Sequence, residues 1–151
     1  ILLIVMFIGG CGGSTTCGIK VFRLQVLPST AKVQISRLLR PHAVVLACYN
    51  KRPVSVEVMD SVMGFFYLFI LGFVLIAIML GMAGLDFVTA LSGAATSISN
   101  VGPGLGEVIG ADGNFSTLPD SAKWIMTFAM LLGRLEIFTV LVMLNPAFWQ
   151  R

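Results

Sequence analysis

The stretch SNVGPGLG, residues 99–106, combines glycine and proline in a segment that cannot continue as a helix. Gly102 can take backbone dihedral angles that are forbidden to other residues, and Pro103 stiffens the chain after it. Extended backbone of this kind leaves carbonyl oxygens free, and a row of carbonyl oxygens can replace the hydration shell of a cation. A surface turn would use the same residues, so this chemistry requires the segment to lie at membrane depth.

A second stretch, GGCGGSTTCG at residues 9–18, interrupts an apolar run with five glycines and small polar side chains. It is not a phosphate-binding loop, because Ile19 separates the last glycine from Lys20. Nor does it fit the dinucleotide fingerprint, because Thr15 stands where a third glycine is needed. A glycine-rich break in a membrane helix favours a hinge or an intramembrane loop, which suits a gate. A plain helix kink is the simpler alternative.

Two charged residues, Arg134 and Glu136, lie near the middle of the last apolar segment. A charge at membrane depth costs about 3 kcal/mol or more unless it faces a wet cavity or a partner. Residues two apart on a helix do not face each other, so each is expected to have its own surroundings. We expect Arg134 to face a permeation path, with Gly133 leaving room for close backbone approach, and Glu136 to have a structural role. The alternative is a pair that merely holds helices together.

The composition is that of a membrane protein. Of the 151 residues, 57% are hydrophobic and 11% are charged, and the mean hydropathy is +0.95. The first apolar run, residues 1–8, is too short to cross a bilayer, which takes about 20 helical residues. We therefore expect the chain to be the C-terminal part of a larger membrane protein.

The sequence gives no support to an enzyme. Cys11, Cys17 and Cys48 are odd in number and without paired spacing, which argues against a disulfide framework. No histidine lies near the first two, which argues against a zinc site. No nucleophile–base pair or cluster of metal ligands appears in the sequence. We therefore expect a protein that is not an enzyme and that carries no cofactor.

Two long apolar segments predict transmembrane helices. The first, residues 61–85, is free of charge. The second covers residues 121–145. Basic residues without any acidic residue among them precede the first segment, whereas residues 86–120 contain acidic residues and no basic ones. By the positive-inside rule the first connection is cytoplasmic and the second lies outside. The cytoplasmic basic residues are Lys20, Arg23, Lys32, Arg37, Arg40, Lys51 and Arg52.

The cytoplasmic connection is expected to begin with a helix that ends at Pro28, because proline disrupts a helix interior. Residues 29–41 then form a second, amphipathic helix with Val33 on its apolar face and Lys32 and Arg37 on its polar face. The polar face either binds anionic lipid or simply fixes the topology. Topology control is the ordinary explanation.

Between the two spans lies a helix that is too short to cross the membrane. Residues 86–99, rich in Ala, Ser, Thr and Gly, would rise about 20 Å as a helix. The hydrocarbon core is about 30 Å thick, so the chain must turn at residues 100–106 and come back out. Such a helix would point its partially negative end toward a cation path. The predicted fold class is an all-α integral membrane protein with a potassium-channel-like helix–pore loop–helix repeat, preceded by a broken transmembrane helix.

Three motifs together resemble the TrkH/KtrB family of bacterial potassium transporters, and its TrkH type in particular: GGCGGSTTCGIKVFR, SISNVGPGLGEV and MLLGRLEIFTVLVMLNPAFWQR. They span almost the whole chain in the family's order. The resemblance implies four helix–pore loop–helix repeats around one pore. Residues 1–52 would hold the second helix of the third repeat and the basic connection, and residues 53–151 the fourth repeat. The latter would contain a pore helix at 86–99 and a filter at 99–103.

The resemblance also implies a function and the residues that perform it. The function would be potassium uptake across the bacterial inner (plasma) membrane by a multi-pass protein, with K⁺ as the transported ion and the only metal. Asn100, Val101 and Gly102 would lie nearest the ions. An intramembrane loop at residues 9–18 would be the gate. The residues assigned to the gate are Gly9, Gly10, Gly12, Gly13, Ser14, Thr15, Gly18 and Arg134.

The partners that the resemblance implies are a second copy of the chain in a homodimer, membrane lipid, and cytosolic TrkA-like nucleotide-binding regulatory subunits. No nucleic-acid partner is expected. The chain departs from the family at Thr16 and Cys17, which stand where glycines are usual and would stiffen the loop or narrow its path. The filter also lacks the Thr-Val-Gly-Tyr-Gly of strict potassium channels, which predicts modest selectivity over sodium.

Two other functions remain open at this point. A secondary solute transporter also uses discontinuous helices and buried charges, with its substrate near the midplane. It gives no reason for a short uncharged helix followed by SNVGPG. A membrane scaffold that transports nothing would leave the cost of Arg134 and of the glycine-rich loop unexplained.

Overall fold

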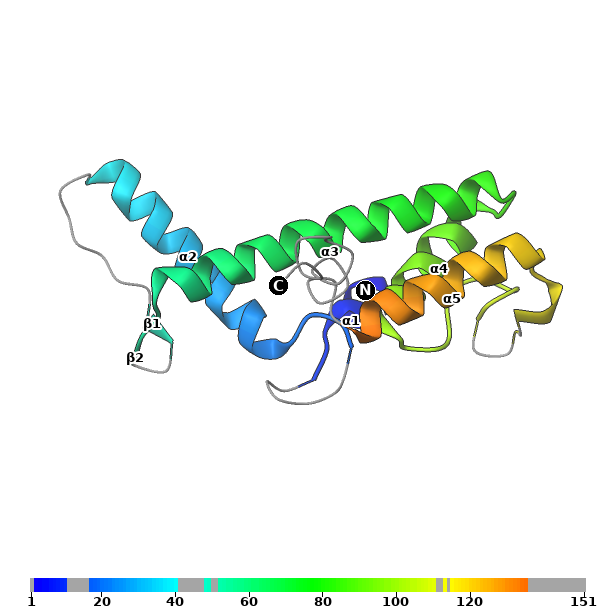
Figure 1. Ribbon diagram of the computed structural model, residues 1–151, viewed down its shortest axis with the longest axis horizontal. Coiled ribbons are helices and arrows are strands. Elements are labelled where there is room, and N and C mark those ends of the chain that lie inside the picture. The colour runs from blue at the N-terminus through cyan, green and yellow to red at the C-terminus, as the bar shows by residue number, and fades with distance from the viewer. Residues whose placement is uncertain are drawn as a thin grey trace, which may run out of the picture.

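The computed structural model describes residues 2–10, 17–40, 48–49, 52–110, 113 and 115–135. The described part is predominantly helical and is arranged around one long helix, α3 (Figure 1). In chain order its elements are α1 (Leu2–Phe7), α2 (Val21–Leu39), β1 (Cys48–Tyr49), β2 (Arg52–Pro53), α3 (Val56–Met82), α4 (Phe87–Ser99), the 3-10 helix η1 (Phe115–Thr117) and α5 (Asp120–Arg134).

Among the described helices, α3 is the one long and apolar enough to cross a membrane, with a mean hydropathy of 2.7 over its best window. Its 27 residues span about 40 Å, more than a hydrocarbon core of about 30 Å. The helix starts at Val56, earlier than the predicted residue 61, so Glu57 and Asp60 belong to its first turns. It ends at Met82, and Gly84 with φ of +89° then turns the chain.

The short helix α4 follows at once. Asp86 is its N-cap, and a side-chain oxygen of Asp86 accepts a hydrogen bond from the Val88 amide at 3.1 Å. Its 13 residues rise about 20 Å, so it lies beside only one end of α3, on the right of Figure 1. From Ser92 to Ser99 the helix is buried throughout, and most of its side chains there are small.

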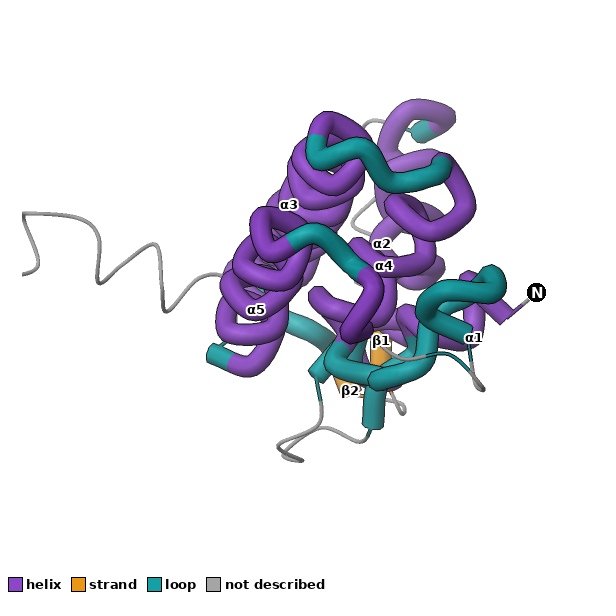
Figure 2. The backbone as a smooth tube through the Cα atoms, turned by 90° about the vertical axis from the view of Figure 1, so that its right-hand side faces the viewer, coloured by secondary structure: helices purple, strands orange, loops and turns teal. Residues whose placement is uncertain are grey.

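The core lies where α3, α4 and α5 pack against one another (Figure 2). Small residues on α4 and α5 let the backbones approach closely, as is common between membrane helices. The Phe7 ring of α1 joins the same core by edge-on contacts with Phe69 and Phe73. The buried core residues of the three helices are Phe65, Phe69, Ile76, Leu80, Ala90, Ala94, Ile98, Ala122, Met126 and Ala129.

The predicted interruption at Pro28 is wrong. Val21–Leu39 form one continuous helix, α2, with Pro28 inside it. The cost of an interior proline is about 3 kcal/mol, and contacts with α3 on both sides of Pro28 offset it. Before the proline, the Arg23 guanidinium lies 3.8 Å from the centre of the Phe65 ring. After it, Val33 packs with Met59.

A small departure from the all-α prediction follows α2. Cys48–Tyr49 and Arg52–Pro53 form a two-residue antiparallel pair, drawn in orange in Figure 2. The register joins Cys48 to Pro53 and Tyr49 to Arg52. Since α2 and α4 lie beside opposite ends of α3, this pair belongs to the end of the molecule away from α4 (Figure 1).

Candidate functional site

The predicted helix break is present at its two described edges. Helix α1 ends at Phe7 and α2 begins at Val21, so residues 8–10 and 17–20 lie outside helices. The two edges join in a parallel bridge between Ile8 and Ile19. In it the Gly9 amide donates to the Ile19 carbonyl and the Ile19 amide donates to the Phe7 carbonyl, both at 2.9 Å. The predicted gate residues Gly12, Gly13, Ser14 and Thr15 lie outside the described residues.

Two glycines make this close pairing possible. A Cβ on Gly9 would lie 2.6 Å from the Cys17 carbonyl oxygen, closer than real side chains approach. Gly18 has φ of +83°, a conformation that side chains rarely adopt. A third hydrogen bond, from the Val21 amide to the Gly10 carbonyl at 3.2 Å, ties the base of the loop to the start of α2. The stem of the glycine-rich loop is therefore a defined structure.

The C-terminal end of α4 passes directly into residues 101–104, which have no regular secondary structure. Asn100 takes the left-handed conformation, with φ 52° and ψ 43°, and so ends the helix. The Val101 amide then donates to the Thr96 carbonyl at 3.1 Å, and the Gly102 amide donates to the Thr96 hydroxyl at 3.0 Å. Gly102 itself has φ of +109°. The strand that contains the predicted filter residues is thus held to the last turn of α4.

Hydrogen bonds and side-chain packing also hold the chain after Gly102 in place. The Gly104 amide donates to the Ile109 carbonyl at 2.6 Å, and the Ile109 side chain fills the space beside Gly104. The Ser92 hydroxyl lies 3.1 Å from the Leu105 carbonyl and 2.7 Å from the Val88 carbonyl of its own helix. The hydroxyls of Ser92 and Thr96 were not among the predicted site residues. Ser92 and Thr96 are four residues apart on a helix of small residues, so they share one face of it. This spacing was the sequence signal that could have identified them.

Helix α5 packs against the end of α4 and against Asn100. Gly133 packs so tightly against the end of α4 that a Cβ on it would collide with the Ile98 carbonyl. The Asn100 side-chain amide donates to the Met130 carbonyl at 3.0 Å, across 30 positions of the chain. Arg134 follows Gly133 directly and is exposed.

These parts meet around one pocket of about 320 Å³. It brings together the edges of the glycine-rich loop, the first residues of the filter strand and Arg134, which are far apart in the sequence. Gly18 and Gly102 are not among its lining residues. The lining consists of Met6, Ile8, Gly9, Gly10, Cys17, Ser99, Asn100, Val101 and Arg134.

The chemistry of the pocket is that of oxygen dipoles and one cation. Among the described residues the lining includes no carboxylate, and these residues hold no group of three or more His, Cys, Asp and Glu suited to a metal. The end of α4 contributes partially negative carbonyls, which favour a cation. Ser99 is 6% exposed, and its hydroxyl has no hydrogen-bond partner among the described residues. Arg134 contributes a positively charged side chain to the same lining.

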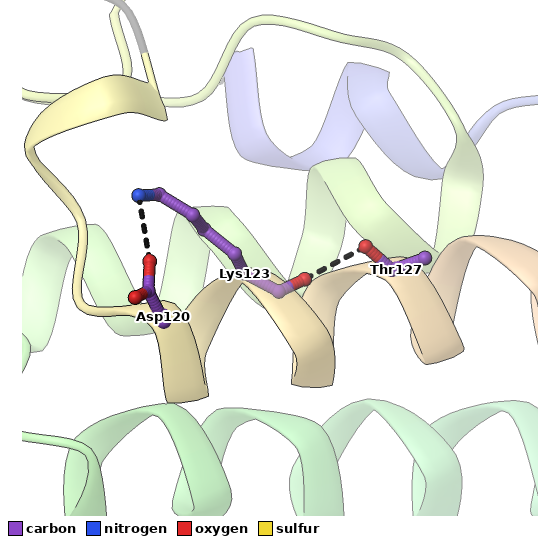
Figure 3. Close-up of polar contacts among 3 residues, drawn as sticks. All are labelled: Asp120, Lys123 and Thr127. Carbon is purple, nitrogen blue, oxygen red and sulfur yellow. Dashed lines mark hydrogen bonds and ion pairs between the residues drawn. The ribbon is translucent and has the colours of Figure 1, made fainter.

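The first turns of α5, away from the pocket, carry a solvent-exposed ion pair. The Lys123 ammonium pairs with the Asp120 carboxylate at 3.1 Å, and the Thr127 hydroxyl donates to the Lys123 carbonyl at 2.8 Å (Figure 3). Asp120 is 91% exposed, so the pair is a solvated one of small energetic value. Trp124 is exposed on the same turns. Glu136 lies outside the described residues.

Comparison with known proteins gives one consistent answer. Residues 1–151 match the family described as TrkH, cation transport protein. The chain is 49% identical over 145 residues to the Trk system potassium uptake protein TrkI of Halomonas elongata, covering 96% of this chain and 30% of that protein. It is 39% identical over 150 residues to the Trk system potassium uptake protein TrkH of Escherichia coli, covering 99% of this chain and 30% of that protein.

A solved structure agrees with these relatives. The crystal structure of the potassium transporter TrkH from Vibrio parahaemolyticus matches with a TM-score of 0.86 and 40% identity. The match covers 98% of this chain and 31% of the solved chain. The chain therefore spans about a third of the length of the relatives that it matches.

Proposed function

We propose that this chain, which belongs to the TrkH family of cation transport proteins, forms part of a potassium uptake pathway through the membrane. The family is one of membrane transporters and not of enzymes. The observation that carries the proposal is the pocket shared by Gly9, Asn100 and Arg134. It brings together a glycine-rich break, a non-helical segment after a short helix, and a positively charged side chain on a third helix.

The strand at residues 100–102 is proposed as one part of a potassium filter. Its support is the left-handed turn at Asn100, which ends α4 and starts a non-helical segment beside the pocket. The amides of Val101 and Gly102 are bonded to Thr96, which fixes the direction of these peptide groups, and we propose that the carbonyls of the segment face the ions. The pore-helix role of α4 belongs to the same proposal.

The glycine-rich loop and Arg134 are proposed as the gate. The hydrogen-bonded stem at Gly9 and Ile19 fixes where the loop enters and leaves, next to the first residues of the strand. Arg134 adds a positive charge to the same pocket, and a positive charge in a low-dielectric path opposes the passage of cations. Displacement of either element from the pocket would lower the barrier.

The location and partners are also proposals. The basic connection before α3 supports a multi-pass protein of the bacterial inner membrane with α2 on the cytoplasmic side. TrkA-like nucleotide-binding regulatory subunits on that side and a homodimeric assembly are proposed from the family resemblance. The third and fourth repeats of a four-repeat pore would then account for residues 1–52 and 53–151.

The test uses the full-length protein that contains this chain, reconstituted in liposomes with its cytosolic partner. A radioactive rubidium tracer reports uptake driven by an outward potassium gradient. Tracer accumulation well above that of empty liposomes is the expected result. No accumulation under any gradient would contradict the proposal and favour a secondary solute transporter, in which the glycine-rich break holds a substrate.

A further inference from the structure

Two contacts fasten the end of α4 and the residue that follows it, Asn100, to α5, a helix that lies some thirty residues further along the chain. The first is the hydrogen bond from the Asn100 side-chain amide to the Met130 carbonyl, at 3.0 Å. The second is the contact of Gly133 with the Ile98 carbonyl, which leaves no room for a Cβ. A Cβ on Gly133 would also lie 3.0 Å from the Asn100 side-chain nitrogen, so the two contacts are adjacent.

Asparagine suits position 100 both by its backbone preference and by its side-chain donors. Its backbone is left-handed, with φ of 52°, a conformation that asparagine tolerates better than most side chains. Its side chain carries two N–H donors, one of which reaches the Met130 carbonyl. Met130 lies one helical turn before Arg134. The bond therefore joins the first residue of the strand to the part of α5 that carries the charge in the pocket.

The strand has a second anchor on its other side. Thr96 of α4 accepts hydrogen bonds from the amides of Val101 and Gly102. With Asn100 intact the strand is thus held between α4 and α5. Without its side chain, the hydrogen bonds that remain at residues 100–102 within the described part of the chain are those to α4.

We propose that Asn100 is a positioning residue whose side chain sets the geometry of the filter strand against α5, so that cation selectivity depends on the Asn100–Met130 bond and on the Gly133–Ile98 contact. This inference rests on the proposed function, in which residues 100–102 line the ion path. Discrimination between potassium and sodium depends on where the coordinating oxygens lie and how firmly they are held. Displacements well under 1 Å are enough to loosen such a site.

The first variant is Asn100→Gly in the full-length protein. Glycine keeps the left-handed backbone without strain and removes only the side-chain donor. The readout is the ratio of rubidium to sodium tracer uptake in liposomes, measured beside the total rate. We expect the ratio to fall about three- to tenfold, the range that one net hydrogen bond supports. A purely structural role would lower the amount of folded protein and leave the ratio unchanged.

The second variant changes the same contact on its α5 side. Gly133→Ala places a Cβ against the Ile98 carbonyl and pushes α5 away from the strand, so the same loss of selectivity is expected. The matched control is Gly81→Ala in α3, where a Cβ meets nothing within 4 Å among the described residues. The control should keep both the rate and the ratio.

The double variant decides whether the two residues act together. If Asn100→Gly and Gly133→Ala disturb one contact, their effects on the ratio will be clearly less than multiplicative. An unchanged ratio in Asn100→Gly at normal total uptake would overturn the inference and leave the proposed function intact. Absence of uptake by the wild type would overturn both.

A further variant covers the case in which Asn100→Gly fails to fold. Asn100→Asp keeps the size and the tolerance of left-handed backbone but loses the N–H donor toward Met130. The same fall in the ratio is expected for this variant. A wild-type ratio in Asn100→Asp would overturn the inference.

Discussion

Arg134 is the charged residue among the described residues that line the shared pocket, and the other residues of that lining are uncharged. At an effective dielectric constant of 20, two unit charges 4 Å apart repel by about 4 kcal/mol. In the proposed ion path, an arginine at such a distance would lower the flux of cations by more than tenfold. Its position on the turn after Met130 also places it next to the hydrogen bond that anchors Asn100 to α5.

At this scale we predict that Arg134→Ala raises cation leak through the closed protein by about tenfold, because 1.4 kcal/mol of barrier is one decade in rate. Arg134→Lys keeps the positive charge and is the matched control. The measurement is rubidium tracer flux in liposomes without the cytosolic partner. Equal leak in Arg134→Ala and the wild type would leave Arg134 with a structural role.

Among the elements, α2 is the one in which packing overrides local preference. Pro28 is exposed and lacks an N–H, yet the helix continues through it from Val21 to Leu39. The Thr30 hydroxyl donates to the Val26 carbonyl at 3.0 Å, and both residues are buried. Contacts with α3 on either side hold the two halves in one line.

We predict that Pro28→Ala stabilises the protein by about 1–3 kcal/mol, because alanine restores a helix hydrogen bond where the backbone is already helical. Thermal unfolding in detergent would measure it as a higher midpoint. Gln34→Ala, at another exposed position of α2, is the control and should shift stability by no more than about 0.5 kcal/mol. A lower midpoint for Pro28→Ala would contradict this prediction and mean that the proline ring itself is needed for packing.

Local sequence signals predicted some of these elements and not others. The start of α4 at Asp86 and its end at residues 99–100 follow from a capping side chain and from residues that cannot continue a helix. The glycine run predicted the break between α1 and α2 for the same reason. The bond from Asn100 to Met130 was not predictable, since it depends on the close approach of α5 at Gly133. The error at Pro28 also arose from tertiary contacts.

At the scale of the whole molecule, the long helix α3 is the element against which α2, α4 and α5 pack. Helix α2 packs beside its first half, where Arg23 meets Phe65, and α4 beside its second half (Figure 1). The basic residues of α2 and the exposed pair of Asp120 and Lys123 therefore lie toward opposite ends of the long helix. This separation is what the positive-inside rule requires of a protein with α2 in the cytoplasm.

From this arrangement we predict that single cysteines introduced in α2 and in η1 react with a membrane-impermeant thiol reagent from opposite sides of the membrane. In a full-length background without native cysteines, Gln34→Cys should react only with reagent on the cytoplasmic side. Thr117→Cys should react only with reagent outside, and Ile70→Cys in the middle of α3 should react with neither. Labelling of Gln34→Cys and Thr117→Cys from one side would contradict the proposed topology.

The central claim is that residues 100–102 form part of a potassium filter, and Gly102 tests it most directly. Its φ of +109° strains any side chain, whereas a Cβ would meet nothing within 4 Å among the described residues. Gly102→Ser therefore changes the backbone of the strand without a clash. The measurement is the rubidium-to-sodium uptake ratio of the full-length protein in liposomes. We predict a ratio several-fold below that of the wild type, with uptake retained, because the strain is about 1–2 kcal/mol. An unchanged ratio would contradict the filter assignment.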